Sequence, residues 1–362
     1  MDFKIITNNL SGKGGLEVVI REMMTCFPNY YKDIKSSLII IDDIPNIEIF
    51  EDLNNIKLFN NSLFSNLGKI GSALFMLIEI INAKERFIIG TSPKIIRYSK
   101  KIKKIFRKKY LIVSWIHFSL NEPFITKSDL LHADYHFSIS PGLTKQFVDL
   151  QGHSLNVFTI FNPIKQQNLE ISRPSYPIFL SIGRLVEQKN NIELLKAAEM
   201  LPQNKPWKIV FYGDGEKKDE LVNFVIEKNL TDRVEFKGWV SDPWSEINEA
   251  TALILTSHFE GFVMVVLEAI SRGLPCICSN CPTGPADVIN DANGFLYTPG
   301  KVTELAEKMI FFLNNSAQPK MRSSEIQKSI NHLYEDAYFK RVYDALIEMD
   351  NRDSSLNRKI SP

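Results

Sequence analysis

Residues 251–279, TALILTSHFEGFVMVVLEAISRGLPCICS, contain two short apolar runs on either side of a helical pattern. The runs at 251–257 and 274–279 have the length of buried strands. Between them, the spacing of apolar residues predicts a helix over 263–271. Continuous apolar runs suit parallel strands that are covered on both faces. This stretch therefore predicts a strand–helix–strand unit of an α/β fold.

The same alternation extends to both sides of this unit. Strands are predicted at 3–7, 36–42, 86–90, 110–117, 136–140, 157–161, 177–183, 207–213, 233–239, 251–257, 274–279 and 294–298. The polar segment 162–175, with two prolines, interrupts the alternation and is predicted to be a linker. Two consecutive β/α series predict two doubly wound, Rossmann-like domains that face each other across a cleft. Their predicted bounds are 1–165 and 174–328, followed by one or two C-terminal helices over 329–352 that can return to the first domain.

The composition excludes several classes of protein. A formal net charge of +1 favours no nucleic-acid partner. The opening residues do not have the pattern of a signal peptide, and the apolar segment 70–81 is too short to span a membrane, so a cytoplasmic protein is expected. Cys276, Cys278 and Cys281 form C-x-C-x-x-C without a second ligand pair nearby, so no metal is expected there.

In doubly wound sheets, ligands bind just beyond the carboxyl ends of the strands. Glu260 follows the strand 251–257, and the amides of Gly261, Phe262 and Val263 open the next helix, which favours a phosphate group. Glu268 lies about one turn inside this helix and can face the same cleft. Carboxylates accept hydrogen bonds from vicinal hydroxyls, so the two glutamates are candidate ligands of sugar and ribose.

Two cations follow the first strand of the second half. Arg184 and Lys189 offer a guanidinium fork and an ammonium, which suit a diphosphate and its departure as a leaving group. Gly213 makes a tight turn after the next strand. Two solvated surface cations are the alternative interpretation.

The first half offers weaker candidates. Gly14 and Gly15 belong to a glycine-rich loop that opens a helix, although its spacing is neither a P-loop nor G-x-G-x-x-G. His117 ends the predicted fourth strand, where it can bind or polarise a substrate. A tight turn and a structural histidine are the alternatives.

Taken together, these motifs resemble the retaining glycosyltransferases of family 4, which have the GT-B fold, and the resemblance covers nearly the whole chain. It rests on the E-x7-E spacing of Glu260 and Glu268, the Arg184 and Lys189 pair, the glycine pair and the histidine. It implies that Arg184 and Lys189 hold the diphosphate and stabilise it as it leaves. It also implies that Glu268 binds the ribose and Glu260 the transferred sugar.

The resemblance extends to the first half of the chain. It implies that His117 contacts the sugar near its reacting carbon, and that Gly14 and Gly15 let their loop close over the diphosphate. The chain has Asp287 where many members of the family carry a glutamate, which puts the nucleotide contact of that loop in question.

Within the family, stretches such as SWIHFSL, TSHFEGF and NGFLYTPG resemble the transferases that add galactose to the lipopolysaccharide core of enterobacteria. This implies UDP-galactose as the donor and a core sugar as the acceptor. Other donors (UDP-glucose, UDP-GlcNAc or GDP-mannose), a nucleotide-sugar epimerase of the same fold and a non-catalytic sensor are the alternatives. A glycosidase is disfavoured because it needs no cations for a diphosphate. Asp-x-Asp is absent, so neither a metal nor a cofactor is expected.

The segment 93–111 contains nine Lys or Arg residues and no acid. Its apolar residues recur at helical spacing, which predicts an amphipathic helix on the anionic cytoplasmic face of a bacterial inner membrane. The alternative is an ordinary helix packed on its sheet, with a wet basic face. The residues predicted to contact the membrane are Lys100, Lys101, Lys103, Lys104, Arg107 and Lys108.

Overall fold

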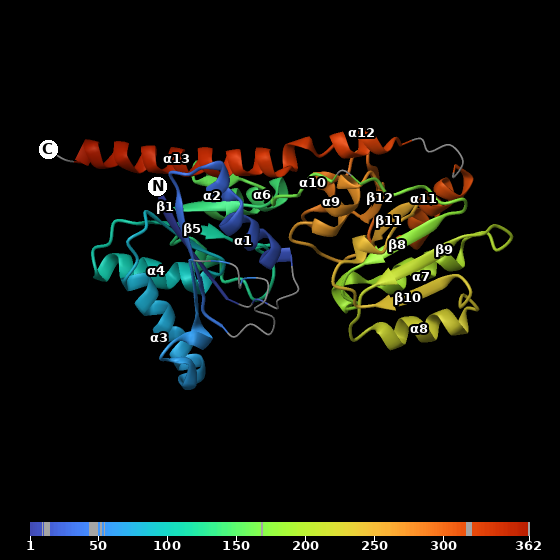
Figure 1. Cartoon of the computed structure of the whole chain (residues 1–362), viewed down its shortest axis with the longest axis horizontal. Helices are drawn as coiled ribbons and strands as arrows, with labels where there is room; N and C mark the ends of the chain where they lie inside the picture. Colours follow the sequence, from blue (N-terminus) through green and yellow to red (C-terminus); the bar gives the residue numbers. More distant parts are fainter. Residues whose placement is uncertain are drawn as a thin grey trace. The chain divides into compact units, whose positions relative to one another are not determined.

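The computed structural model describes residues 1–8, 10, 15–42, 50, 53, 55–167, 169–315 and 321–360 of the chain, with side chains described as far as 355. It divides into two compact units (Figure 1). Unit 1 comprises Met1–Pro163 and Asp336–Pro362, and unit 2 comprises Ile164–Glu335. None of the described helices combines the length and the apolar character that a membrane crossing needs.

Unit 1 is built on a seven-stranded parallel sheet in the order β3-β2-β1-β4-β5-β6-β7. Its strands are β1 (Asp2–Thr7), β2 (Lys35–Ile40), β3 (Ile56–Leu58), β4 (Phe87–Gly90), β5 (Leu111–Trp115), β6 (Tyr135–Ser138) and β7 (Val157–Thr159). The six strands predicted for this half are confirmed. The prediction missed β3, because three partly exposed residues at the sheet edge carry no apolar run. The predicted fourth strand is therefore β5.

Helices cover both faces of this sheet (Figure 1). They are α1 (Gly15–Thr25), α2 (Phe27–Tyr30), α3 (Gly68–Ile81), α4 (Pro93–Ile105), α5 (Lys127–Leu130), α6 (Pro141–Gln151) and α13 (Glu335–Ile360), with the 3₁₀ turns η2 (Phe59–Asn61) and η3 (Ser65–Leu67). The C-terminal helix α13 packs on unit 1. Its Tyr343 stacks on Tyr31 with ring centroids 3.9 Å apart, and Asp350 and Asp353 form ion pairs of 2.6 and 2.7 Å with Arg86.

Unit 2 repeats the architecture with six parallel strands in the order β10-β9-β8-β11-β12-β13. The strands are β8 (Ile178–Ile182), β9 (Lys208–Tyr212), β10 (Val234–Gly238), β11 (Ala252–Leu255), β12 (Cys276–Ser279) and β13 (Gly294–Tyr297). All six coincide with predicted strands. The helices and turns are α7 (Asn191–Glu199), α8 (Lys218–Glu227), α9 (Met264–Ser271), α10 (Pro285–Val288), α11 (Val302–Asn314), α12 (Ser323–Lys328), η4 (Glu187–Lys189), η5 (Pro243–Ser245) and η6 (Asn331–Leu333).

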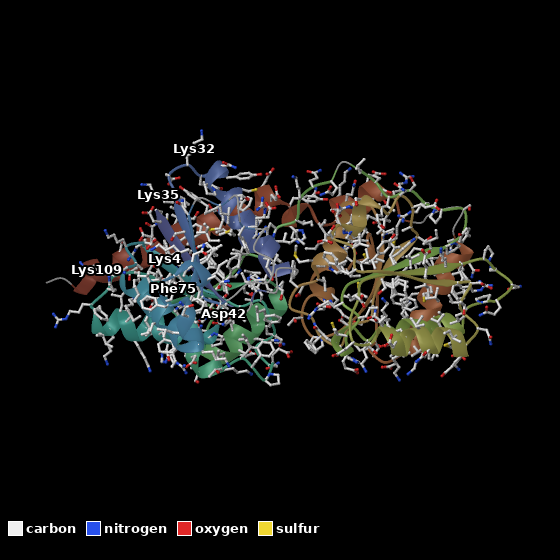
Figure 2. All side chains as sticks on the ribbon, turned by 60° about the horizontal axis from the view of Figure 1, so that its bottom comes forward. Lys4, Lys32, Lys35, Asp42, Phe75 and Lys109 are labelled. Atoms are coloured by element: carbon white, nitrogen blue, oxygen red, sulfur yellow. The ribbon has the colours of Figure 1, made fainter. Side chains whose placement is uncertain are left out.

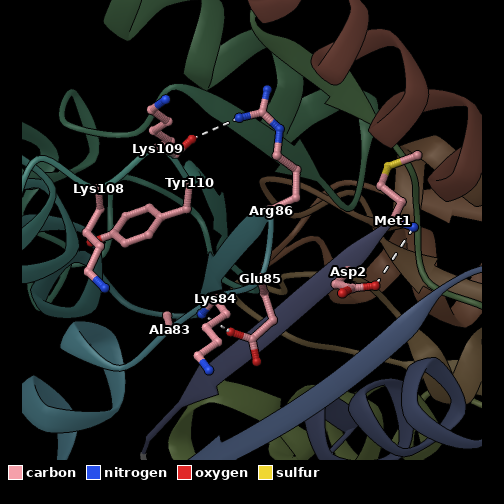
Figure 3. Close-up of a pocket in the computed structure, with 9 residues that line it drawn as sticks. All are labelled: Met1, Asp2, Ala83, Lys84, Glu85, Arg86, Lys108, Lys109 and Tyr110. Atoms are coloured by element: carbon pink, nitrogen blue, oxygen red, sulfur yellow. Dashed lines mark hydrogen bonds and ion pairs between the residues drawn. The ribbon is translucent and has the colours of Figure 1, made fainter.

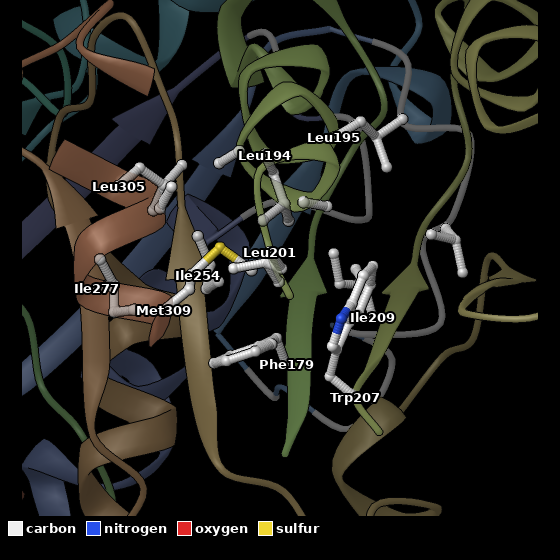
Figure 4. Packing of buried hydrophobic residues seen from close by; sticks show 14 of the residues in the cluster. Phe179, Leu194, Leu195, Leu201, Trp207, Ile209, Ile254, Ile277, Leu305 and Met309 are labelled. Carbon is white, nitrogen blue, oxygen red and sulfur yellow. The ribbon is translucent and has the colours of Figure 1, made fainter. Parts of the chain in front are cut away.

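The core of unit 2 lies between its sheet and the helices packed on it (Figure 4). Phe179 of β8 and Ile277 of β12 are fully buried, together with Leu194 of α7 and Met309 of α11. Burying each such side chain contributes roughly 1.5–3 kcal/mol to stability. The central strands therefore have continuous apolar runs, because both of their faces are covered. The edge strand β10 (VEFKG) instead alternates apolar and charged residues.

The strand order of unit 2 reverses next to β8. The chain passes from β8 to β9 on one side and later returns to β11 on the other. Such a reversal opens a crevice at the carboxyl ends of the two central strands, where doubly wound folds bind ligands. The segment 164–172 is tied to this unit by two isolated bridges, Ile164 with Tyr334 and Ser172 with Glu249.

Candidate functional site

The loops that follow β8 and β11 meet in an ion pair. Lys189 ends η4 after β8, and Glu260 lies in the loop after β11. Their Nζ and Oε1 atoms are 2.6 Å apart. Glu260 is only 8% exposed. The Ser257 hydroxyl donates to the same carboxylate oxygen at 2.5 Å, and the Thr256 hydroxyl donates to the Lys189 carbonyl at 2.8 Å. The structure thus brings two predicted site residues into direct contact.

Backbone contacts fix the two loops to each other. The His258 amide donates to the Gln188 carbonyl at 2.9 Å. In return, Nε2 of Gln188 donates to the Phe259 carbonyl at 2.9 Å. The position of Glu260 is therefore set by both loops and not by β11 alone.

A third loop, after β12, closes around Glu260. The Thr283 hydroxyl donates to the Glu260 carbonyl. Gly284 has φ +92°, and a Cβ atom at this position would lie 3.3 Å from Cγ1 of Val263. The Gly284 amide donates to Oδ2 of Asp287 at 3.4 Å. Asp287, the position that departs from the family pattern, thus contacts the backbone at the start of α10.

Helix α9 begins at Met264, one residue later than predicted. Phe262 and Val263 are buried, with 7% and 1% exposure, and Gly261 is half-buried. These three residues form the approach to the helix N-terminus, where the partial positive charge of the helix favours an anion.

Glu268, inside α9, has partners that the sequence did not indicate. Its Oε2 atom accepts a hydrogen bond of 2.8 Å from Nε1 of Trp244, which lies in η5 beyond β10. The Arg272 guanidinium lies 4.8 Å from the centre of the Trp244 ring, and its Nη1 donates to the Glu268 carbonyl at 3.0 Å. Burial raises the pKa of Glu268, while the Trp244 hydrogen bond and the Arg272 charge oppose that rise.

Arg184 and Gly213 lie at the carboxyl ends of β8 and β9. Arg184 is exposed, and among the described residues its guanidinium makes no hydrogen bond or ion pair. Gly213 has φ +148°, and an added Cβ would lie 1.9 Å from the Gly183 carbonyl oxygen. Only glycine allows the backbones of these two loops to approach so closely.

His117 belongs to unit 1 and follows β5. Burial lowers its pKa to about 3, so the imidazole is neutral at pH 7. Its ring centroid lies 4.7 Å from that of Trp115. Its Nε2 atom is buried and has no hydrogen-bond partner among the described residues. Gly15 starts α1 of the same unit, whereas Gly14 lies outside the described residues.

The prediction that the apolar residues of α4 form a membrane-facing stripe is wrong for half of the helix. Ile95 and Ile102 are buried in unit 1, with 0% and 4% exposure. A helix on a sheet turns its apolar face inward, and the sequence pattern cannot distinguish that packing from lipid contact. Only Ile105 and Phe106, where the helix ends, are exposed, at 71% and 50%.

The basic face of α4 is also partly neutralised. Lys100 and Lys103 pair with Asp134 at 3.6 and 2.6 Å, and Arg97 pairs with Asp129 at 3.2 Å. The segment itself contains no acid, but the fold supplies two from a later part of the chain. These ion pairs offset part of the positive charge of α4, but the Lys100 side chain is still 46% exposed.

Lys101, Lys104 and Arg107 remain exposed. Lys108 instead lines a hollow at the amino ends of β1, β4 and β5 (Figure 3). There the Arg86 guanidinium donates to the Lys109 carbonyl at 2.8 Å. Ligands of doubly wound folds bind at the opposite, carboxyl edge, so this hollow is not a candidate site.

The cysteines are part of the core. Cys276 and Cys278 are fully buried in β12, and burial raises the pKa of both thiols. Burial also raises the pKa of Cys281 to about 11. Across the described part of the chain, no group of three or more His, Cys, Asp or Glu side chains is arranged to hold a metal ion.

The known proteins that are similar to this chain are glycosyltransferases. Residues 164–330 match the family described as Glycosyl transferases group 1. The lipopolysaccharide 1,6-galactosyltransferase of Escherichia coli (strain K12) is 30% identical, over 97% of this chain and 99% of that protein. The apo structure of the lipopolysaccharide outer core galactosyltransferase WaaB gives a TM-score of 0.84 at 28% identity, over 96% of this chain and 99% of that one. HepE from Anabaena, solved with UDP-glucose, shares the fold with a TM-score of 0.77 at 20% identity, over 95% and 99%. The predicted GT-B fold is confirmed.

Proposed function

This chain belongs to the group 1 glycosyltransferases, and from that premise we propose that it transfers galactose from UDP-galactose to a sugar of the lipopolysaccharide core. A full-length relative that is 30% identical supports this choice of donor and acceptor. The observation that carries the proposal is the Lys189–Glu260 pair at the carboxyl ends of β8 and β11. It combines a cation for phosphate with a carboxylate for sugar hydroxyls.

The charges of this pair explain how it serves a donor. Lys189 donates one of its three N–H groups to Glu260, and the other two can donate to the diphosphate. Ser257 and Lys189 both occupy Oε1 of Glu260, so Oε2 is the oxygen that accepts a hydrogen bond from a hydroxyl of the transferred sugar. Lys189 also offsets the repulsion between this carboxylate and the phosphates.

Arg184 completes the binding of the diphosphate. Its exposed guanidinium can form two parallel hydrogen bonds with phosphate oxygens. As the bond to the sugar breaks, negative charge grows on the departing UDP. Cations already in place stabilise that charge more in the transition state than in the ground state.

Glu268 binds the ribose. Its Oε2 is held by Trp244, which leaves Oε1 to accept from the ribose hydroxyls. Ionised carboxylates are the stronger acceptors, so binding requires the charged form. Trp244 and Arg272 favour that form against the cost of burial.

The reaction retains the anomeric configuration, with same-face attack in which the leaving phosphate helps to deprotonate the acceptor. Burial lowers the pKa of His117 to about 3, so its imidazole is neutral at pH 7. This neutral imidazole offers a hydrogen bond to the sugar. Gly14 and Gly15 allow their loop to close on the diphosphate. Arg184, Lys189 and the approach to α9 take the place of a metal ion, and no cofactor is needed.

The enzyme acts at the cytoplasmic face of a bacterial inner membrane, where the acceptor is anchored. Lys101, Lys104 and Arg107 are exposed cations that attract anionic lipid. The contact is peripheral.

A donor panel tests the proposal. The protein is incubated with lipopolysaccharide core acceptor and one donor at a time: UDP-galactose, UDP-glucose, UDP-GlcNAc or GDP-mannose. The mass of the acceptor product is then measured by mass spectrometry. UDP-galactose is expected to add one hexose at the highest rate. Preference for another donor would replace galactose while keeping the transferase. Conversion of the donor without any acceptor product would favour an epimerase, and binding without turnover would favour a sensor.

A further inference from the structure

Helix α3 is apolar on two opposite sides. Its inner side, with Phe75, Met76 and Ile80, is buried in unit 1 at 6%, 0% and 0% exposure. A helix that carries apolar residues on opposite sides is usually buried on both. The outer side of α3 has no such cover from the described residues.

The outer side forms a continuous exposed stripe. Leu67, Ile70 and Leu74 are 55%, 72% and 39% exposed, and their spacing of three and four residues places them along one side of the helix. Leu63, which precedes η3 in the chain, is 96% exposed. A contiguous apolar surface of this kind marks an interaction site more often than scattered exposed residues do.

The neighbouring helix presents the opposite chemistry. Right-handed crossovers place α3, between β3 and β4, and α4, between β4 and β5, on the same face of the sheet. The two helices are in contact and are neighbours in Figure 1. Figure 2 labels Phe75, on the inner side of α3. Lys94, Lys101 and Lys104 lie exposed along one side of α4 and pair with no acid in the part of the chain that the structure describes.

We propose that the outer side of α3 inserts into an anionic lipid bilayer while the outward lysines of α4 contact the lipid phosphates. Apolar side chains at the depth of the acyl chains beside cations at the depth of the headgroups are the pattern of interfacial binding. A second copy of this chain fits the surface poorly, because a symmetric pair would bring two rows of lysines together. The inference rests on the proposed membrane contact and goes beyond it by naming the inserting helix.

Vesicle sedimentation tests the inference with two sets of variants. The stripe variant combines Leu67→Gln, Ile70→Gln and Leu74→Gln, and its control combines Leu155→Gln and Ile226→Gln, which are 67% and 58% exposed elsewhere. The wild type and the control are expected to sediment with vesicles of phosphatidylglycerol and phosphatidylethanolamine. The stripe variant is expected to bind at least roughly tenfold more weakly, since each buried leucine or isoleucine supplies about that factor.

A charge variant separates the two parts of the surface. Lys94→Gln, Lys101→Gln and Lys104→Gln together should remove most of the salt-sensitive binding and the preference for anionic vesicles. Lys165→Gln with Lys301→Gln, two exposed lysines of unit 2, should leave both unchanged.

The membrane contact and the role of α3 can fail separately in this experiment. If the wild type does not sediment with anionic vesicles, both the membrane contact and the role of α3 are wrong. If the stripe variant sediments like the wild type, only the role of α3 is wrong. A wild-type dimer that becomes a monomer in the stripe variant, measured by light scattering, would make the stripe a subunit interface and overturn the inference. If the stripe variant melts early, Ile70→Gln alone carries the same test.

Discussion

At the scale of the residue, the central feature is the contact between Lys189 and Glu260. An isolated carboxylate beside a diphosphate site would repel the donor. An isolated ammonium would bind the phosphates but could not accept a hydrogen bond from a sugar hydroxyl. The two groups are joined at 2.6 Å, and in the proposed mechanism they present a cation to the phosphates and an acceptor to a sugar hydroxyl. Arg184, which has no partner among the described residues, is the second cation of the proposed mechanism.

Arg184→Ala should lower kcat strongly. The loss of one cation that stabilises the departing diphosphate is expected to cost about 2–4 kcal/mol of transition-state stabilisation. Steady-state kinetics measure the effect, and Lys228→Ala, an exposed cation at the end of α8, should leave kcat unchanged. Near-normal turnover of Arg184→Ala would remove this residue from the mechanism.

Trp244→Phe should weaken UDP binding most at low pH. The substitution keeps an aromatic ring beside Arg272 but removes the N–H that donates to Glu268. Burial already raises the pKa of Glu268, and losing this hydrogen bond raises it further. UDP affinity depends on the ionised carboxylate, so it is lost as the pH falls through that pKa, and the loss moves to higher pH in the variant.

Calorimetry with UDP across the acidic to neutral range measures this shift. Glu268→Gln serves as the reference, with binding roughly tenfold weaker and without the pH dependence of the carboxylate. A Trp244→Phe protein with the pH profile of the wild type would show that the hydrogen bond does not tune Glu268.

At the scale of the element, the two central strands of unit 2 place the site. The residues beyond β8, β9, β11 and β12 converge because parallel strands end at one edge of the sheet. The approach of the loops depends on backbone as much as on side chains. Gly213, for example, leaves no room for a Cβ atom against the Gly183 carbonyl.

Gly213→Ala should destabilise the protein by about 2–4 kcal/mol, because the added Cβ cannot coexist with the Gly183 oxygen at 1.9 Å. Gly300→Ala is the matched control. Gly300 also has a positive φ, of +82°, but an added Cβ would meet nothing within 4 Å, so only about 1 kcal/mol should be lost. Urea denaturation measures both, and equal losses would show that the close approach is not what selects glycine.

Sequence reasoning was strongest for elements with a clear apolar pattern. Twelve strand predictions were possible because most of these strands are continuous apolar runs, although β10 (VEFKG) alternates apolar and charged residues. The rule that ligands bind beyond the carboxyl ends of strands then placed Lys189 and Glu260 at one edge. Trp244 was missed, because nothing in η5 signals that it reaches a carboxylate 24 positions later. The environment of α4 was missed for a related reason, since Asp129 and Asp134 become its partners only through the fold.

At the scale of the whole molecule, two doubly wound units, each with a topological switch at its central strands, form a GT-B glycosyltransferase. The cations and carboxylates proposed to bind the donor belong to unit 2, which contains the family match over 164–330. In the proposed function, unit 1 contributes His117 and the surface of α3 and α4. The proposal thus assigns the donor to the cations and carboxylates of unit 2 and the lipid contact to the surface of unit 1.

Transfer should continue in the presence of EDTA. Asp-x-Asp is absent from the chain, and Arg184 and Lys189 provide the positive charge that a metal would otherwise bring to the diphosphate. Activity is compared before and after chelation, with Mg²⁺ and Mn²⁺ added back. Complete loss that either metal restores would contradict this part of the mechanism.

The most direct test of the central claim is NMR spectroscopy of the product formed from UDP-galactose and lipopolysaccharide core acceptor. The donor carries galactose in the α configuration, and same-face attack preserves it. We predict one new α-anomeric galactosyl signal on the acceptor, in step with the release of UDP. A β-anomeric signal would contradict retention, and free galactose or an unchanged acceptor would contradict the transfer itself.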